Sequence, residues 1–363
     1  MSLDKVVKLT FVTLTVFQVG LAFNSRVIPM ILGTLLSMTY LLGYLRKVEL
    51  SNKQLILFFT LFFHSVIYLI NSFEVESFIR VINCAFICLV TSVFFNSRDK
   101  NKLIVYTLVV AWLFLFLELV MRMPSLNPVY IFNTVSSNLH ILKFGTPFFS
   151  DSNGVGIFAL CIYILCDLTY KENKFMRYFF LSSFILFTLL TISRSCILGL
   201  VLYIVISILK NYSRISVRVW IFVCFLISTL LLIPTIVDIL SIDNSSNDRL
   251  LVFIDLFNRI GSDGYFKLLF GYGETIGKTF FTFREGHYAH AFIPLVLGQS
   301  GLVSFISFLF LAVLVSYKNE DVFYYLIIIS IIGLIFLPPY FEIVYYVLSI
   351  LLSVEFNKNK ERF

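Results

Sequence analysis

The chain has 363 residues, of which 59% are hydrophobic and 13% charged, and its mean hydropathy is +0.93. A soluble domain of this size needs far less apolar surface, whereas each membrane-spanning helix needs about 20 mostly apolar residues. The formal net charge is +7, but the basic residues stand in small groups between apolar runs. This distribution is typical of topology signals and not of a nucleic-acid surface, so we expect no nucleic-acid partner.

Apolar runs recur along the chain and predict an all-α fold, a polytopic transmembrane helix bundle of about 12 spans that forms one integral membrane domain over residues 1–363. The N-terminus has the charge pattern of a signal sequence but no small-x-small cleavage site, which predicts an uncleaved first span. All six cysteines lie within apolar runs, which predicts buried thiols. The predicted spans are 6–23, 27–45, 54–71, 77–95, 103–121, 153–170, 175–192, 195–209, 217–237, 289–316, 322–338 and 340–356.

Lysine and arginine predict the orientation, because cytoplasmic segments of membrane proteins carry an excess of them. With the N-terminus inside, 18 of the 28 basic residues fall in cytoplasmic segments, and only five fall in short segments on the other side. We therefore expect both termini in the cytoplasm. The same alternation predicts two extracytoplasmic loops, 121–152 and 238–289. The first is rich in turn-forming residues, which favours irregular structure.

The large loop, 238–289, gathers ionisable side chains that the flanking spans lack, and we treat it as the candidate active site. Hydrophobic residues recur at helical spacing from Leu250 to Ile260, and the opposite face carries Arg249 and Arg259. This pattern predicts an amphipathic helix on the membrane surface. A plain interfacial helix whose arginines contact lipid head groups would give the same pattern. A tight glycine turn, Leu269-Phe-Gly-Tyr-Gly273, follows it.

The end of this loop, Arg284-Glu-Gly-His-Tyr-Ala-His290, leads directly into a predicted span. His290 is therefore expected at the membrane surface, where a neutral imidazole can accept a proton. A metal site made of His287, His290 and Glu285 is a second interpretation. It lacks a convincing set of further ligands, so the sequence predicts neither a metal ion nor another cofactor.

Arg194 stands between two apolar runs in the segment Thr191-Ile-Ser-Arg-Ser-Cys196. An arginine at the membrane edge is costly, and by default it marks an anion site. The alternative is a turn residue whose side chain extends to the outer surface.

The order of these features resembles the O-antigen polymerase and O-antigen ligase superfamily. His290 and Gly301 are similar to that family's His-[Asn/Ser/Gln]-x9-Gly pattern, although Ala291 departs from it. Ser150-Asp-Ser-Asn153 is similar to the Asp-x-Asn step that opens a span in these proteins. The resemblance covers roughly the C-terminal two-thirds of the chain. Its remaining motifs are Ser193-Arg-Ser-Cys-Ile-Leu-Gly-Leu200, Asn247-Asp-Arg-Leu250 and Leu269-Phe-Gly-Tyr-Gly273.

The resemblance implies a membrane glycosyltransferase that moves a glycan from undecaprenyl pyrophosphate to an acceptor hydroxyl, outside the bacterial cytoplasmic (inner) membrane. Arg194 and Arg249 would bind the pyrophosphate leaving group, and His290 would take the proton from the attacking hydroxyl. The implied partners are the lipid-linked glycan, membrane lipid, and a chain-length regulator and flippase of the same pathway. The residues implied in substrate binding are Arg284, Arg259, His287, Asp151 and Asn153.

Three activities compete as interpretations of this pattern. A polymerase joins one lipid-linked repeat unit to another, whereas a ligase moves finished polymer onto a lipid A core. The richness in Phe, Ile, Asn and Lys, a bias common in surface-polysaccharide loci, favours the polymerase. A flippase for lipid-linked sugars predicts repeated halves and broken or charged helices near the bilayer midplane. Because no repeat is visible and the ionisable groups gather on one face, we favour an enzyme.

Overall fold

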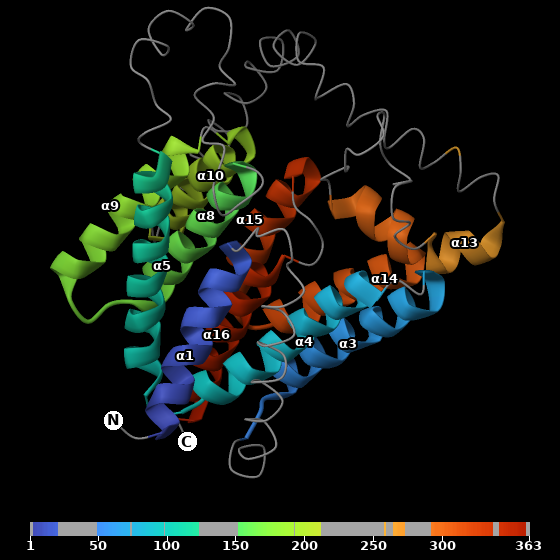
Figure 1. Ribbon diagram of the computed structural model, residues 1–363, viewed down its shortest axis with the longest axis horizontal. Coiled ribbons are helices and arrows are strands. Elements are labelled where there is room, and N and C mark those ends of the chain that lie inside the picture. Colours follow the sequence, from blue (N-terminus) through green and yellow to red (C-terminus); the bar gives the residue numbers. More distant parts are fainter. Residues whose placement is uncertain are drawn as a thin grey trace, which may run out of the picture.

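The computed structural model describes residues 3–20, 49–72, 75–97, 99–122, 152–191, 193–211, 258, 264–272, 292–336 and 341–360. Every regular element in these ranges is a helix, which confirms the all-α prediction (Figure 1). The helices are α1 (Leu3–Gly20), α3 (Asn52–Ser72), α4 (Val75–Phe95), α5 (Lys100–Arg122), α8 (Ser152–Thr169), α9 (Lys174–Leu190), α10 (Arg194–Asn211), α13 (Tyr265–Phe270), α14 (Phe292–Ser316), α15 (Glu320–Phe336) and α16 (Glu342–Lys360).

Ten of the twelve predicted spans have a helix at the same place in the chain, and the other two, 27–45 and 217–237, lie outside the described residues. The structure does not support twelve as the number of spans. Among the described helices, two segments, Lys100–Met121 and Leu295–Ser316, are long and apolar enough to cross a membrane. For two of the other helices the reason is length, because a span needs about 20 residues and both α9 and α15 have 17.

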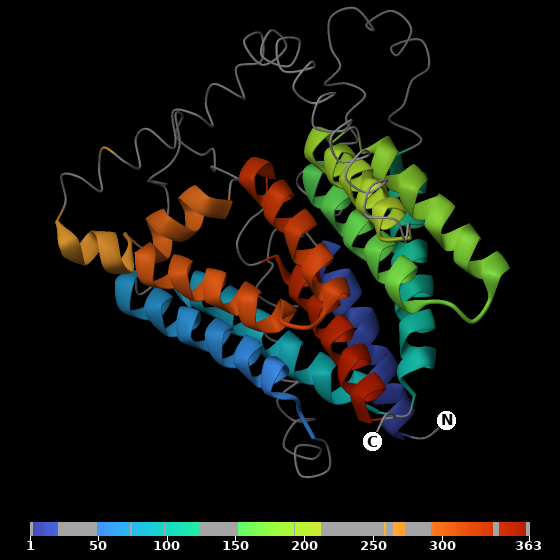
Figure 2. The same ribbon diagram turned by 180° about the vertical axis from the view of Figure 1, so that it is seen from behind.

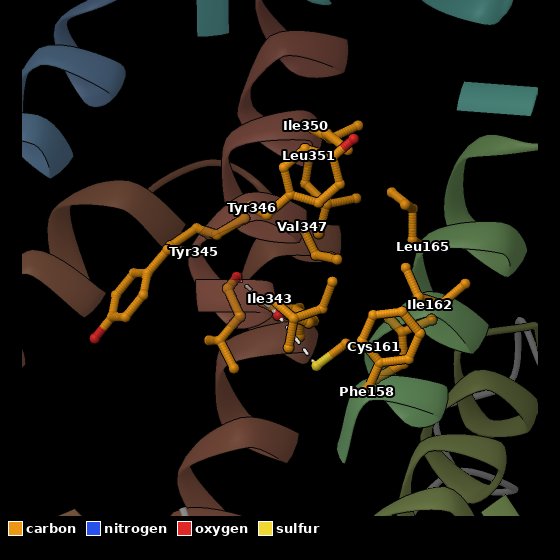
Figure 3. Packing of buried hydrophobic residues seen from close by; sticks show 14 of the residues in the cluster. Phe158, Cys161, Ile162, Leu165, Ile343, Tyr345, Tyr346, Val347, Ile350 and Leu351 are labelled. Carbon is orange, nitrogen blue, oxygen red and sulfur yellow. Dashed lines mark hydrogen bonds between the residues drawn. The ribbon is translucent and has the colours of Figure 1, made fainter. Parts of the chain in front are cut away.

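The core runs through the bundle without a break, and α16 lies at its centre. Apolar side chains of α16 pack against α8, as Figure 3 shows for Val347 of α16 and Ile162 of α8. The Tyr325 hydroxyl of α15 donates a hydrogen bond of 2.9 Å to the Val344 carbonyl and so joins α15 to α16. The prediction of buried thiols is confirmed for the five cysteines in the described part of the chain: Cys84, Cys88, Cys161, Cys166 and Cys196.

Polar side chains fasten one end of the bundle, where segments predicted to be cytoplasmic come together. Lys53, at the start of α3, pairs with Glu355, near the end of α16, at 2.8 Å. The same carboxylate accepts a hydrogen bond of 2.7 Å from Asn319, in the turn between α14 and α15. Lys210, at the end of α10, pairs with Asp321 at 2.7 Å. These helix ends therefore lie on one side of the molecule, as the predicted alternation of spans requires, and the starts of α8 and α10 lie at the opposite end.

Candidate functional site

The first turn of α8 meets the start of α10 at this opposite end. Ser193 immediately precedes α10, and its carbonyl accepts the hydrogen bond of Ile197 N–H at 2.9 Å. Its hydroxyl donates to Oδ1 of Asn153 at 2.6 Å and lies 3.2 Å from the hydroxyl of Ser195. Both serines are almost fully buried. Two motifs that sequence analysis singled out separately are therefore neighbours, since Asn153 of the Asp-x-Asn step contacts Ser193 of the Ser-Arg-Ser stretch.

The contact between α8 and the turn before α10 is close because Gly156 has no side chain. A Cβ atom at Gly156 would lie 2.7 Å from Sγ of Cys196 and 2.9 Å from Oγ1 of Thr191, both closer than van der Waals contact. The Cys196 thiol also donates a hydrogen bond of 3.7 Å to the Asn153 carbonyl. The backbone positions of Asn153 and Arg194 are thus fixed relative to each other by packing as well as by the Ser193 hydrogen bond.

Arg194 is the first residue of α10, although its side chain lies outside what the structure describes. Both α8 and α10 begin at this point, so the positive ends of two helix dipoles lie near one another. Backbone N–H groups in the first turn of a helix lack acceptors within the helix and favour an anion. An anion such as a phosphate group would suit these helix starts. For Asn153 the structure shows a structural role, because its Oδ1 accepts the Ser193 hydroxyl.

The structure also shows a break in α14, which sequence analysis missed. Gly301 has φ 76° and ψ −176°, which is not helical, and Figure 1 shows α14 bending sharply. The rings of Phe292 and Phe308 lie 5.2 Å apart between centroids, in an edge-to-face arrangement. Sixteen residues of straight helix would separate them by about 24 Å. The predicted straight span 289–316 is therefore two half-helices, 292–300 and 302–316, folded against each other. The segment Leu295–Ser316, long and apolar enough to cross a membrane, includes this break and is not one straight helix.

The turn that follows α13 lies against this break, and Figure 2 shows α13 beside the bend of α14 from behind. The N–H of Tyr272 donates a hydrogen bond of 2.7 Å to the carbonyl of Gly298. The structure thus joins the glycine turn, of which Leu269–Tyr272 are described, to the glycine of the His-x9-Gly pattern. The spacing of these two motifs along the chain gave no signal of their contact.

A buried histidine is another feature that sequence analysis did not single out. His64, in α3, is fully buried, hydrogen-bonds the Ser307 hydroxyl and packs edge-to-face on Phe308, with ring centroids 4.3 Å apart. It therefore joins α3 to the second half of α14. A histidine inside an apolar run was a usable signal, because ionisable residues within spans are rare and generally face the bundle interior.

Most predicted site residues lie outside the described part of the chain. His290 and Arg249 do so entirely, and His290 precedes the first residue of α14 by two positions. Of the predicted amphipathic helix only Asn258 is described, and it is helical and exposed. The short helix α13, within the predicted loop 238–289, was not predicted. The other predicted site residues outside the described ranges are Arg284, Arg259, His287 and Asp151.

The sequence matches no protein-family model, and no curated protein is significantly similar to it. The resemblance to the O-antigen polymerase and ligase superfamily therefore rests on the sequence motifs alone.

Proposed function

We propose that this chain is a membrane glycosyltransferase that joins undecaprenyl-pyrophosphate-linked repeat units into O-antigen or a related surface polysaccharide, on the extracytoplasmic face of the inner membrane. The observation that carries the proposal is the 2.6 Å hydrogen bond between Ser193 and Asn153 beside Arg194. It unites two motifs of the resemblance, forty positions apart, at one end of the bundle. That end is the one to which both predicted extracytoplasmic loops lead.

The chemistry of the donor fits an arginine at paired helix starts. When a glycan leaves undecaprenyl pyrophosphate, negative charge develops on the pyrophosphate oxygens. A guanidinium stays charged at any physiological pH and can bind two oxygens at once. Groups held ready for a charge that appears in the transition state account for much of enzymatic rate acceleration. Arg194 and Arg249 are the proposed ligands of the leaving group.

The acceptor needs a base, because a sugar hydroxyl must lose its proton as it attacks. In the proposal the hydroxyl oxygen forms the new glycosidic bond, the bond to pyrophosphate breaks, and the proton passes to neutral His290. Arg284, Arg259, His287, Asp151 and Asn153 are proposed to hold the substrate. The balanced products are a glycan longer by one repeat unit and one undecaprenyl pyrophosphate.

Exposed apolar side chains support a membrane location. Phe59 and Ile70 of α3 are 60% and 62% exposed, and Phe310 of α14 is 64% exposed. Large contiguous apolar surface is rare on soluble monomers and generally indicates a partner or lipid. Hydrocarbon chains of a bilayer are the covering that suits these helices, since α3, α5 and α14 carry further exposed apolar residues: Phe62, Phe63, Leu113, Phe116, Leu117, Val120, Leu309 and Val313.

The broken helix α14 bears on the transporter alternative, because transporters bind substrates at broken helices. Here the Gly298 carbonyl next to the break already accepts the Tyr272 N–H. The break is thus filled by the protein's own backbone, and this observation favours the enzyme. A ligase would use the same donor chemistry and differs only in its acceptor.

The test is the lipid-linked glycan pool in cells that lack this protein. If the protein is a polymerase, its loss leaves single lipid-linked repeat units that an external glycosidase can reach. Loss of a ligase leaves full-length lipid-linked polymer instead, and loss of a flippase leaves single units that are protected on the inner face. Either of the last two pools would reject the polymerase.

A further inference from the structure

We infer that the turn Leu269–Tyr272, here called the docked turn, is a fixed partner of broken helix α14 and not a lid that opens during turnover. In this role it positions the first half of α14, at the end of the loop proposed to carry the acceptor base. The activity test rests on the proposed function, whereas the docking itself can be tested without it.

The break in α14 removes a helical hydrogen bond, and the docked turn supplies a replacement. In an uninterrupted helix the Gly298 carbonyl would accept the N–H of residue 302. With Gly301 in a non-helical conformation, that carbonyl instead accepts the N–H of Tyr272 at 2.7 Å. A backbone group without a partner is costly where water is excluded, and irregular backbone at membrane depth persists only where protein buries it. The docked turn therefore replaces a missing part of the helix.

The docked turn and α14 contact each other through their backbones, and each segment needs a glycine at the contact. Gly271 has φ 80°, and a Cβ atom there would lie 2.5 Å from the carbonyl oxygen of Gln299. Gly301 has φ 76°, and a Cβ atom there would overlap the carbonyl oxygen of Leu269. The φ/ψ region of both residues is essentially restricted to glycine. Each glycine thus admits the backbone of the other segment.

Side-chain packing holds the first half of α14 at its other end, where the helix begins. Phe292, its first residue, packs edge-to-face on Phe308 of the second half, and Phe308 in turn packs on buried His64 of α3. The first half is therefore held at its start by aromatic rings and at its end by the docked turn. Opening of the docked turn would leave the Gly298 carbonyl without its hydrogen-bond partner, so we expect the docked turn to stay in place.

The chain supplies a matched control for glycine substitutions. Gly264 has φ 85°, so alanine there meets the same backbone restriction, but no atom lies within 4 Å of its added Cβ. We expect Gly271→Ala and Gly301→Ala to lower polymer formation by about 10²-fold, through misplacement of the first half of α14. Gly264→Ala should stay close to the native chain. Equal effects of the three substitutions would show that backbone strain, not docking, explains them, and would overturn the inference.

A cysteine pair tests whether the docked turn must open. Tyr272→Cys combined with Gly298→Cys places two thiols on hydrogen-bonded residues, and a disulfide between them would hold the turn closed. We expect oxidation to cross-link the pair and to leave polymer formation at the level of the reduced pair. Loss of activity on oxidation, restored by dithiothreitol, would show that the turn opens in each cycle. Failure to cross-link would show that the contact does not form.

Failure of the proposed function can be told apart from failure of this inference. If the native chain forms no polymer, the proposed function is rejected, but the purified variants still report on docking. Gly271→Ala and Gly301→Ala should lower the melting temperature in detergent further than Gly264→Ala does. They should also abolish cross-linking of the cysteine pair, whereas Gly264→Ala should preserve it. The absence of either difference would overturn the inference.

Discussion

The hydroxyl of Ser193 donates a hydrogen bond of 2.6 Å to Oδ1 of Asn153, and this bond ties the start of α10 to the first turn of α8. The donor is nearly fully buried, so the bond is expected to contribute to stability as well as to geometry. Because Arg194 follows Ser193 directly, the bond also fixes where the backbone of the proposed pyrophosphate ligand lies.

Asn153→Asp separates a role of Asn153 in stability from its proposed role in donor binding. Aspartate keeps an acceptor for Ser193 but adds a negative charge where the donor pyrophosphate is proposed to bind. We expect KM for the lipid-linked donor to rise by at least about tenfold, with the melting temperature little changed. Ser193→Ala, which removes the hydroxyl alone, should lower the melting temperature and affect KM less. A native KM for Asn153→Asp would remove this residue from the donor site.

Arg194→Ala should lower polymer formation by at least about 10²-fold, because a charge that stabilises the leaving group is lost. Arg194→Lys should recover little, since lysine keeps the charge but not the planar fork. We expect the same pair of results at Arg249. The assay is polymer formation in membranes with matched protein levels.

Arg177→Ala is the matched control for the arginine series. Arg177 pairs with Asp167 at 2.6 Å, at the end of α8 remote from Asn153. Its loss should reduce stability and leave the KM for the donor unchanged. Normal polymer from both Arg194→Ala and Arg249→Ala would rule out their role at the pyrophosphate.

His290→Gln tests the proposed general base. Glutamine can still form hydrogen bonds but cannot take a proton, so the chemical step should slow by about 10²–10⁴-fold. Donor binding should persist, because the arginines are intact. His287→Gln, three positions earlier, should be impaired but active. A nearly active His290→Gln would refute the assignment of the base, and an inactive His287→Gln would transfer the role to His287.

Much of the fold could be predicted from the sequence, because helix positions follow from apolar runs alone. The number of spans could not, since apolar runs such as those of α9 and α15 give helices of 17 residues, shorter than the about 20 residues that a span needs. The break at Gly301 was also missed. Glycine within an apolar run is compatible with a straight helix, and only the approach of Leu269–Tyr272 from a distant segment determines its conformation.

Candidate site residues could be chosen from the sequence only where a residue type is unusual in its surroundings. Arg194 between apolar runs marked the start of α10, and the structure brings Asn153 beside it. The link between them depends on Ser193 and on the small size of Gly156, neither of which stands out in a polar turn or an apolar run. His64 could be detected as a histidine within an apolar run, but its contacts could not be predicted, because Ser307 and Phe308 lie far along the chain.

The orientation in the membrane is tested by reporter fusions. Lys53 and Glu355 pair at 2.8 Å, so the start of α3 and the end of α16 share one side, which the distribution of basic residues predicts to be cytoplasmic. A reporter fused after Gly264 should be active only outside the cytoplasm, and one fused after Lys358 only inside. Reversed signals at these two positions would place the proposed site on the wrong face.

The central claim is the joining of lipid-linked repeat units, and reconstitution measures it most directly. The purified chain in lipid vesicles is supplied with one undecaprenyl-pyrophosphate-linked repeat unit, and products are separated by length. We predict a ladder of lipid-linked glycans that differ by one repeat unit, with one undecaprenyl pyrophosphate released for each new linkage. Repeat units that remain single, or that cross the bilayer without being joined, would contradict the account.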